Sequence, residues 1–376
     1  MARATAIDLR SDLCTVPTAE MWDAMRAAEL GLAAFGEDAS VNELCGRVAE
    51  LLGKPAALWV PTCGMANLVA LLTFCEPGDA VVLESSSHVL TSEAMGIVEI
   101  AGLEPRSLWA ADGRIAPDAV DELVAESRAP LLVLENTHTR AGGTVLSVEQ
   151  VAALADAANR HDCRVHVDGA RLVNASVALG VPLAALAQRA NSVALSLNKG
   201  LSAPLGTVLA GSEAVVARAH VMLRRLGGAT VHRAGIAAAA GLVALDTMID
   251  RIGDDHRRAR ELAARLASVP GLRLDPEVVE TNIVLVDVAA TGLPPEELLG
   301  LLEQVGVRAM ERDASRIRFV THRLIGDDDV EEAARVVADV VERHSVPPFE
   351  LPEVEGLAEL EEAEPEEPEH EERGAG

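Results

Sequence analysis

The sequence predicts an α/β fold in two parts. A large domain over residues 1–250 is built on a mostly parallel central sheet, and a smaller α+β domain covers residues 251–345. In the large domain, short apolar runs with β character alternate with helical patterns. These runs are apolar on both faces, as strands are when helices cover both sides of a parallel sheet. The alternation stops near residue 250, which predicts the second domain.

Five apolar runs are the expected strands of the large domain. They cover residues 56–60, 80–84, 131–136, 164–168 and 192–198. The helical patterns between them include residues 64–74, 147–161 and 170–180. Ligands of such sheets bind beyond the carboxyl ends of the strands, so the residues that follow each run are candidates for a functional site.

The second domain is expected to contain helices and strands in a less regular order. The pattern predicts helices at 254–269, 294–304 and 328–344, and strands at 281–288 and 317–322. Residues 346–376 differ again, because from Glu350 onward they hold twelve glutamates and one arginine with few large apolar residues. Such a composition cannot bury a core, which predicts a disordered acidic tail.

Charge and composition exclude several classes of protein. The net charge is −27, and phosphate contacts need clustered Lys and Arg, so nucleic acid is not an expected partner. No apolar run approaches the roughly 18–20 residues that cross a bilayer, and the first residues lack a hydrophobic signal-peptide core. The five cysteines are scattered, which predicts reduced thiols, no metal site and a cytoplasmic location without a membrane partner. Since the chain has no tyrosine, it cannot use one in catalysis.

Lys199 is notable because the chain contains only one other lysine, Lys54. Lys199 follows one expected strand, and Asp168 ends the strand before it, so both can reach the same edge of the sheet. A lysine amine forms a Schiff base with an aldehyde, which arginine cannot do. A carboxylate can pair with a protonated pyridine nitrogen. Together they indicate pyridoxal 5'-phosphate as cofactor, although each alone would be an ordinary surface lysine or helix-capping aspartate.

Residues 60–72, "VPTCGMANLVALL", predict a strand, a turn of small residues and a helix. Backbone N–H groups at the start of a helix bind anions. Cys63, Gly64 and Met65 are therefore candidates to hold the cofactor's phosphate, although an ordinary strand-to-helix turn has the same pattern.

Several motifs resemble the low-specificity L-threonine aldolases, which belong to the pyridoxal-phosphate-dependent β-eliminating lyases. They are "IDLRSD", "FGEDASVNELCGRVAELLGK", "ENTHTRAGG", "HVDGARLVNASVALG" and "NKGLSAPLGTVLAGS", and the resemblance covers roughly residues 6 to 340. It implies an aspartate-aminotransferase-like fold (fold type I) and a homodimer or homotetramer. It also implies retro-aldol cleavage of β-hydroxy-α-amino acids, such as L-threonine and L-allo-threonine, to glycine and an aldehyde.

On the cofactor side, the resemblance implies roles for four residues. Lys199 matches the Schiff-base lysine, and Asp168 matches the partner of the pyridine nitrogen. His88, in "ESSSHVL", matches the histidine that stacks on the ring, and Glu93 keeps the family's spacing after it. Arg171, in "DGAR", matches an arginine near the cofactor and the substrate carboxylate.

On the substrate side, the resemblance implies three further contacts. Ser11 and Arg318 match residues that hold the α-carboxylate, for which a planar guanidinium is well suited. His138, in "ENTHTR", matches a histidine that reaches the substrate hydroxyl. The base that removes the hydroxyl proton is left open between His88, His138 and a water that they hold.

The chain also departs from the family at the phosphate turn. Thr62-Cys63-Gly64 stands where the family has Ser-Gly-Thr, so one threonine hydroxyl is lost from its usual place. Two alternatives therefore stay open: a pyridoxal-phosphate-dependent β-elimination on another amino acid, and a non-catalytic binding protein with this fold.

Overall fold

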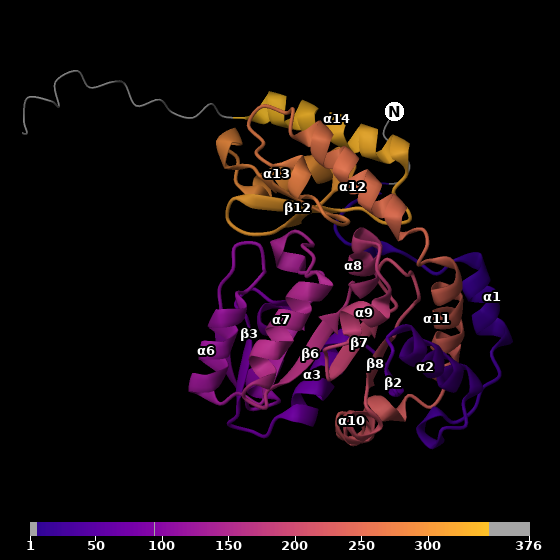
Figure 1. The fold of residues 1–376 in the computed structure, drawn as a ribbon. Helices are drawn as coiled ribbons and strands as arrows, with labels where there is room; N and C mark the ends of the chain where they lie inside the picture. The colour runs from indigo at the N-terminus through magenta and orange to yellow at the C-terminus, as the bar shows by residue number, and fades with distance from the viewer. Residues whose placement is uncertain (1–5, 94, 346–376) are drawn as a thin grey trace, which may run out of the picture.

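The computed structural model describes residues 6–93 and 95–345. Within this part of the chain the central sheet has seven strands in the order β2-β8-β7-β6-β5-β3-β4 (Figure 1). Their bounds are β2 (Ala56–Val60), β3 (Ala80–Glu84), β4 (Glu104–Leu108), β5 (Leu131–Glu135), β6 (Arg164–Gly169), β7 (Ser192–Ser196) and β8 (Thr207–Gly211). Strands β4, β3, β5, β6 and β7 are parallel, and β8 is antiparallel to both of its neighbours. The predicted α/β fold with a mostly parallel sheet is confirmed.

Helices accompany these strands along the chain. They are α1 (Ala19–Ala27), α2 (Ala39–Leu51), α3 (Cys63–Phe74), α4 (His88–Thr91), α5 (Gly96–Glu99), α6 (Pro117–Ser127), α7 (Val148–Asn159), α8 (Leu172–Leu179), α9 (Leu183–Ala187), α10 (Glu213–Arg225) and α11 (Gly235–Thr247). Several begin at a side-chain cap; Ser147 and Gln150, for example, form a complete capping box at the start of α7.

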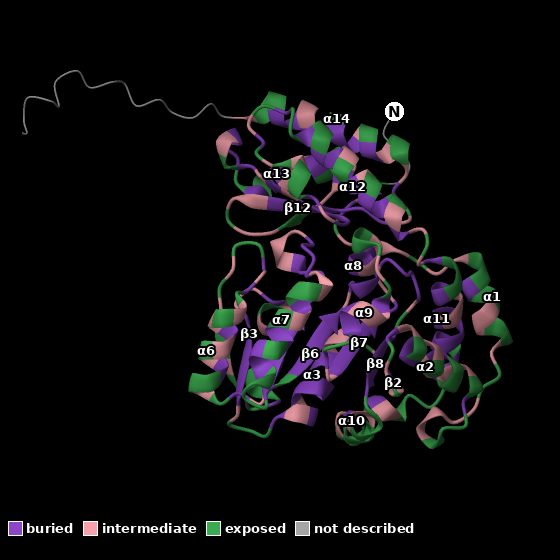
Figure 2. Ribbon diagram, viewed as in Figure 1, coloured by how far each residue is buried: buried purple, intermediate pink, exposed green. Residues whose placement is uncertain are grey.

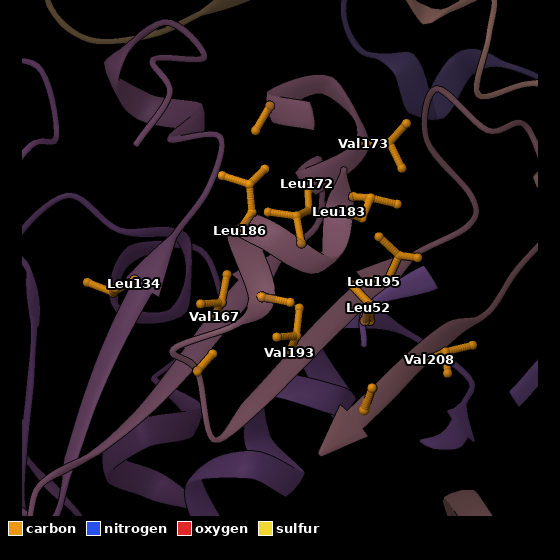
Figure 3. Close-up of a cluster of buried hydrophobic side chains, with 14 of the residues drawn as sticks. Leu52, Leu134, Val167, Leu172, Val173, Leu183, Leu186, Val193, Leu195 and Val208 are labelled. Atoms are coloured by element: carbon orange, nitrogen blue, oxygen red, sulfur yellow. The ribbon is translucent and has the colours of Figure 1, made fainter. Parts of the chain in front are cut away.

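The sheet is buried on both faces because successive side chains of a strand point to opposite sides. In β5, Leu132 and Leu134 belong to the core that also contains residues of α7, α8 and α9, whereas Leu131 and Val133 pack with residues of α3 and α5. Figure 3 shows strand residues such as Val167 and Val193 beside helix residues such as Leu186 in the first of these cores. Figure 2 shows the same strands buried along their length. This two-sided cover explains the uniformly apolar runs in the sequence.

Strand β4 was not predicted. Its sequence, Glu-Pro-Arg-Ser-Leu, lies at the edge of the sheet and has no buried residue. An edge strand with little cover lacks the apolar signal by which the other strands were predicted.

A second layer lies above the large sheet (orange and yellow in Figure 1). It contains α12 (Ile252–Leu266), β9 (Ile283–Asp287), α13 (Pro295–Gln304), β11 (Met310–Glu311), β12 (Arg316–Val320) and α14 (Asp327–His344). The N-terminal strand β1 (Ile7–Asp8) pairs with β10 (Val307–Arg308), and Ile7 and Leu9 belong to this second core. The domain boundary after residue 250 stays a prediction, and the predicted acidic tail lies outside the described residues. Among the residues described, no helix combines the length and apolar character that crossing a membrane requires.

Candidate active site

The site lies where parallel strands end. Asp168 is near the end of β6, and Lys199 lies three residues after the neighbouring strand β7. Lys199 lines a cavity of about 250 Å³ together with Ser11, His88, Arg171 and Arg318. A second cavity, of about 570 Å³, is lined by Thr62, Gly64, Met65, His88 and Glu93, so His88 borders both. The structure thus brings most of the sequence-predicted residues to one place.

Asp168 is held in place by three donors. Its Oδ2 accepts a hydrogen bond from Asn67 Nδ2 at 2.9 Å, and its Oδ1 accepts one from the backbone N–H of Ala170 at 3.1 Å. The Cys63 thiol also points at Oδ1, at 3.6 Å. Because the side chain is only 1 % exposed, Asp168 is a buried carboxylate whose position is fixed before any ligand arrives.

The orientation of Asn67 is fixed in turn by His166. Asn67 Nδ2 donates to both Asp168 and Glu93, so Asn67 Oδ1 must accept from His166 Nε2, at 3.1 Å. His166 Nδ1 then accepts from the Ser192 hydroxyl at 2.8 Å. Burial lowers the pKa of His166 to about 4, which keeps its ring neutral and suits this tautomer. Four residues therefore form a chain that ends on the Asp168 carboxylate.

His88 has one ring nitrogen bound and one available. Its Nδ1 lies 3.0 Å from Glu93 Oε1, and its backbone N–H donates to Glu135 Oε2 at 2.7 Å. The hydrogen bond to Glu93 raises the pKa of His88 against the opposing effect of burial, with help from the negative charges of Asp168 and Glu135. Since Glu93 takes Nδ1, Nε2 is the nitrogen that can face a ligand.

His138 is not brought to the cavity. Its Nε2 lies 2.9 Å from the buried Glu84 Oε2, and its Nδ1 is buried without a partner among the described residues. Burial lowers the pKa of His138, but the charges of Glu135 and Glu84 and the bond to Glu84 outweigh it, so the pKa is raised. Gly113 packs so closely on the ring that a Cβ there would lie 2.7 Å from His138 Cγ. The ring is therefore held beside Glu84 and Glu135, and it does not line the cavity that contains Lys199.

Arg171 reaches the site, but its guanidinium is already occupied. Nε and Nη2 donate to the two oxygens of Asp12 at 2.7 and 2.8 Å, and Nη1 donates to Thr139 Oγ1 at 2.9 Å. Burial would raise the pKa of Asp12, but Arg171, Lys199 and Asn282 together lower it to about 2. Arg171 therefore holds Asp12 while it lines the cavity, and its implied contact with a substrate carboxylate stays a prediction.

Arg318 has the free guanidinium instead. It donates from Nη2 to the Arg10 carbonyl at 3.1 Å, and its Nε is buried without a partner among the described residues. Burial lowers its pKa to about 10, helped by the positive charges of Arg171, Arg312 and Arg140. A carboxylate in the cavity would satisfy this group. Ser11 lines the same wall, and its Oγ accepts from the Leu13 N–H at 3.2 Å.

The strand, turn and helix predicted over residues 60–72 are present, and the binding of a phosphate there stays a prediction. Thr62 caps α3, and its Oγ1 accepts from the Met65 N–H at 3.2 Å, so that N–H is not free. The N–H groups of Cys63 and Gly64 and the Thr62 hydroxyl proton remain for an anion. Burial raises the pKa of the Cys63 thiol well above its usual value, as does the charge of Asp168, so Cys63 stays a neutral donor.

The residues present fit pyridoxal 5'-phosphate. An amine, a buried carboxylate, an imidazole and two free N–H groups at a helix start surround two cavities that meet at His88. At Gly64, an added Cβ would meet only Glu93, at 3.5 Å, so the cradle has room beside it.

Fold and site together define a pyridoxal-phosphate-dependent enzyme of fold type I. The beta-eliminating lyase family model matches residues 8–291. The chain therefore belongs to the beta-eliminating lyase family, among the low-specificity L-threonine aldolases, and is a carbon–carbon lyase.

Named relatives and solved structures agree with this assignment. A probable low-specificity L-threonine aldolase 2 of Arabidopsis thaliana is 38% identical over 335 residues, which are 86% of this chain and 94% of that protein. The low specificity L-threonine aldolase of Escherichia coli K12 is 36% identical, over 87% of this chain and 97% of that protein. The fold is similar to a Leishmania major threonine aldolase, with a TM-score of 0.76 at 18% identity over 89% of this chain and 99% of that one.

The sequence analysis missed the residues that support the site: Asp12, Asn67, Glu84, Glu135 and His166. One signal was available, because His166 lies two residues before Asp168 and so shares its face of β6. The partners of Asp12 and Glu84 are 159 and 54 residues away, so no local pattern could reveal them.

Proposed function

We propose that this chain cleaves L-threonine and L-allo-threonine to glycine and acetaldehyde. The observation that carries the proposal is the cavity of about 250 Å³ that is lined by Lys199, His88 and Arg318, of which Arg318 forms no ion pair within the described residues. Its size suits a small amino acid, and its groups match an amine, a β-hydroxyl and an α-carboxylate.

Each residue has a distinct task in this reaction. Arg318 and Ser11 bind the α-carboxylate, which fixes the substrate in the cavity. Lys199 anchors the cofactor and carries a proton to and from the reacting carbon. Asp168 holds the proton on the ring nitrogen, in the geometry set by Asn67 and His166. Pyridoxal phosphate, when bound, supplies the electron sink for the Cα–Cβ bond pair.

We assign the removal of the β-hydroxyl proton to His88. Its Nε2 borders the cavity, while Glu93 holds Nδ1 and so orients the ring. His138 is a poor candidate because both of its nitrogens are buried and Glu84 occupies Nε2. We propose that His138 instead keeps Glu84 and Glu135 ionised.

Incubation of the purified protein with L-threonine tests the proposal. We expect glycine and acetaldehyde, together with a visible absorbance band of the lysine-bound cofactor. Formation of 2-oxobutanoate and ammonia would show β-elimination instead, which the altered phosphate turn keeps open. A protein without that band and without any product would be a non-catalytic binding protein.

We also propose a homodimer or homotetramer in the cytoplasm, without nucleic acid or membrane partners. Exposed large apolar side chains support the oligomer: Phe35 is 73% exposed, and Ile100, which lines the second cavity, is 59% exposed. The five cysteines are free thiols, which suits a reducing compartment. Light scattering coupled to gel filtration tests the assembly, and a mass of one chain at micromolar concentration would contradict it.

A further inference from the structure

Besides Arg171, which binds Asp12, three further arginines line the substrate cavity. Arg140 comes from the turn η3 (Thr139–Ala141) after β5, Arg312 follows β11, and Arg318 lies in β12. The α-carboxylate of threonine carries one negative charge, and one guanidinium can bind it bidentately. Arg140 and Arg312 are therefore in excess of what threonine requires.

These arginines lack carboxylate partners of their own. Among the described residues, neither Arg140 nor Arg318 lies in an ion pair, and Arg312 reaches Asp313 only at 3.9 Å. Asp313 is instead held by Arg316, whose Nε donates to it at 2.8 Å. Arg312 uses its own Nε to bind the Arg140 carbonyl at 2.6 Å, which ties the two residues together.

The other charges near this wall do not cancel the excess. Arg171 lines the cavity too, but Asp12 neutralises it in a bidentate pair. Glu311 lines the cavity on the exposed strand β11 and forms no ion pair with the three arginines within the described part of the chain. Burial lowers the pKa of Arg312, and the positive charges of Arg140 and Arg316 lower it further, against the smaller opposing effect of Asp313 and Glu84.

We propose that this cavity selects β-hydroxy-α-amino acids whose side chain ends in a second carboxylate, of which 3-hydroxyaspartate is the smallest. Arg318 binds the α-carboxylate, and Arg140 with Arg312 binds the second one. This inference rests on the proposed function, because it names a substrate class for the same retro-aldol site.

The reaction balances without a further reactant. The Cα–Cβ bond of 3-hydroxyaspartate breaks, and the β-hydroxyl gives up its proton as Cβ becomes the aldehyde carbon of glyoxylate. The bond pair stays with Cα, which takes up one proton and leaves as glycine. No atom is oxidised or reduced from outside.

Steady-state kinetics of the holoenzyme test the proposal, with L-threonine and both diastereomers of L-3-hydroxyaspartate as substrates. We expect kcat/KM for one hydroxyaspartate diastereomer to exceed that for threonine at least about tenfold, since a charged hydrogen bond contributes about 1.5–3 kcal/mol. R140Q and R312Q should each reduce this ratio about tenfold or more. R106Q is the matched control, because Arg106 is paired with Glu104 on the exposed edge strand β4 and does not line the cavity, and it should leave the ratio unchanged.

A binding measurement gives a second readout that does not depend on turnover. L-malate carries two carboxylates and L-lactate one, and neither has an amine that could react with the cofactor. L-malate should raise the Tm of the cofactor-free protein more than L-lactate does, and R140Q should remove the difference. R140K keeps the positive charge and should retain part of the difference in Tm between L-malate and L-lactate. This control distinguishes the loss of a carboxylate contact from a structural effect of the R140Q substitution.

The outcomes separate this inference from the proposed function. If threonine is cleaved but hydroxyaspartate is not preferred, or if R140Q lowers both substrates equally, the inference is wrong and the proposed function stands. If neither substrate yields glycine, the proposed function is wrong and the inference is wrong with it.

Discussion

Two sets of residues in the site differ in how far their polar groups are hydrogen-bonded or ion-paired. The Asp168 wall consists of Ser192, His166, Asn67 and Asp168, and the Arg318 wall consists of Arg140, Arg312 and Arg318. On the Asp168 wall, a chain of hydrogen bonds runs from Ser192 through His166 and Asn67 to the carboxylate. On the Arg318 wall, guanidinium groups face the cavity without carboxylates, and Arg318 Nε has no partner among the described residues. The residues of the Asp168 wall are buried, whereas Arg140, Arg312 and Arg318 are only partly buried, so the two walls differ in exposure as well as in chemistry.

The contrast shows which interactions the protein completes by itself. A buried polar group without a partner costs free energy, so a fold normally satisfies it. The Asp168 wall follows this rule because its geometry must be ready for a cofactor that stays bound. The arginines of the Arg318 wall do not follow this rule, because their missing partner is the carboxylate of a substrate, which binds and leaves in every catalytic cycle. The predictions that follow compare substitutions on the Asp168 wall with substitutions on the Arg318 wall.

The largest effect is expected at the residue that both walls share. Lys199→Arg should abolish turnover and the visible band of the bound cofactor, because guanidinium stays protonated and forms no imine. Lys54→Arg is the control: Lys54 donates to the Ala190 and Gln188 carbonyls, at 2.6 and 3.5 Å, and arginine can replace that donor. Activity assays with absorbance spectra check both, and substantial turnover by Lys199→Arg would overturn the assignment.

Asn67→Ala interrupts the hydrogen-bonded chain of the Asp168 wall. It leaves the His166 Nε2–H without its acceptor and removes a donor from Asp168, and each buried group left unpaired costs about 1–3 kcal/mol. The free energy of unfolding of the cofactor-free protein, from urea titration, should fall by that order. Asn42→Ala removes one exposed hydrogen bond, to the Gly36 carbonyl, and should cost much less. Equal losses would mean that the hydrogen-bonded chain has no special role.

Arg318→Lys weakens the expected binding of the substrate's α-carboxylate by the Arg318 wall. A point charge replaces a planar fork that binds a carboxylate at two atoms, so the KM for threonine should rise roughly tenfold or more. Cofactor affinity and folding stability should change little, because no carboxylate in the described structure depends on Arg318. Arg316→Lys, on the same strand, is the control. An unchanged KM would mean that another arginine binds the α-carboxylate.

Glu93→Gln shifts the pH dependence of the reaction. Glu93 raises the pKa of His88, and only neutral His88 can accept the hydroxyl proton. Activity of the wild-type enzyme should therefore fall as the pH drops through a pKa above the ordinary histidine value near 6.5. Without the charge of Glu93 that pKa falls, so the acidic limb of kcat/KM should move to lower pH. If the limb does not move, His88 is not the base.

The smallest effect is expected at the phosphate turn. Gly64→Thr restores a hydroxyl there, in a position where an added Cβ meets only Glu93 at ordinary contact distance. A hydrogen bond from a hydroxyl to the charged phosphate adds about 1.5–3 kcal/mol, so loss of cofactor on dialysis should slow roughly tenfold. Gly64→Ala, which adds the Cβ alone, is the control. Abolished cofactor binding in Gly64→Thr would show that the turn binds the phosphate differently from our assignment.

The sequence by itself determined the sheet and the meeting of Lys199 with Asp168. Uniformly apolar runs identify strands that are covered on both faces, and the carboxyl ends of parallel strands meet at one edge. Two residues that follow such runs therefore lie at the same edge of the sheet, and they are close when their strands are adjacent, as β6 and β7 are. The same reasoning failed for β4, because an exposed edge strand needs no apolar face.

Only the tertiary structure decided which of the predicted polar residues are available to a ligand. Arg171 is occupied by Asp12, 159 residues away, and His138 by Glu84, 54 residues away, whereas Arg318 has no carboxylate partner in the described structure. A motif fixes the type and position of a side chain along the chain. Whether that side chain is satisfied depends on charges and donors that folding brings from distant segments, and the energy of a buried polar group depends on those partners.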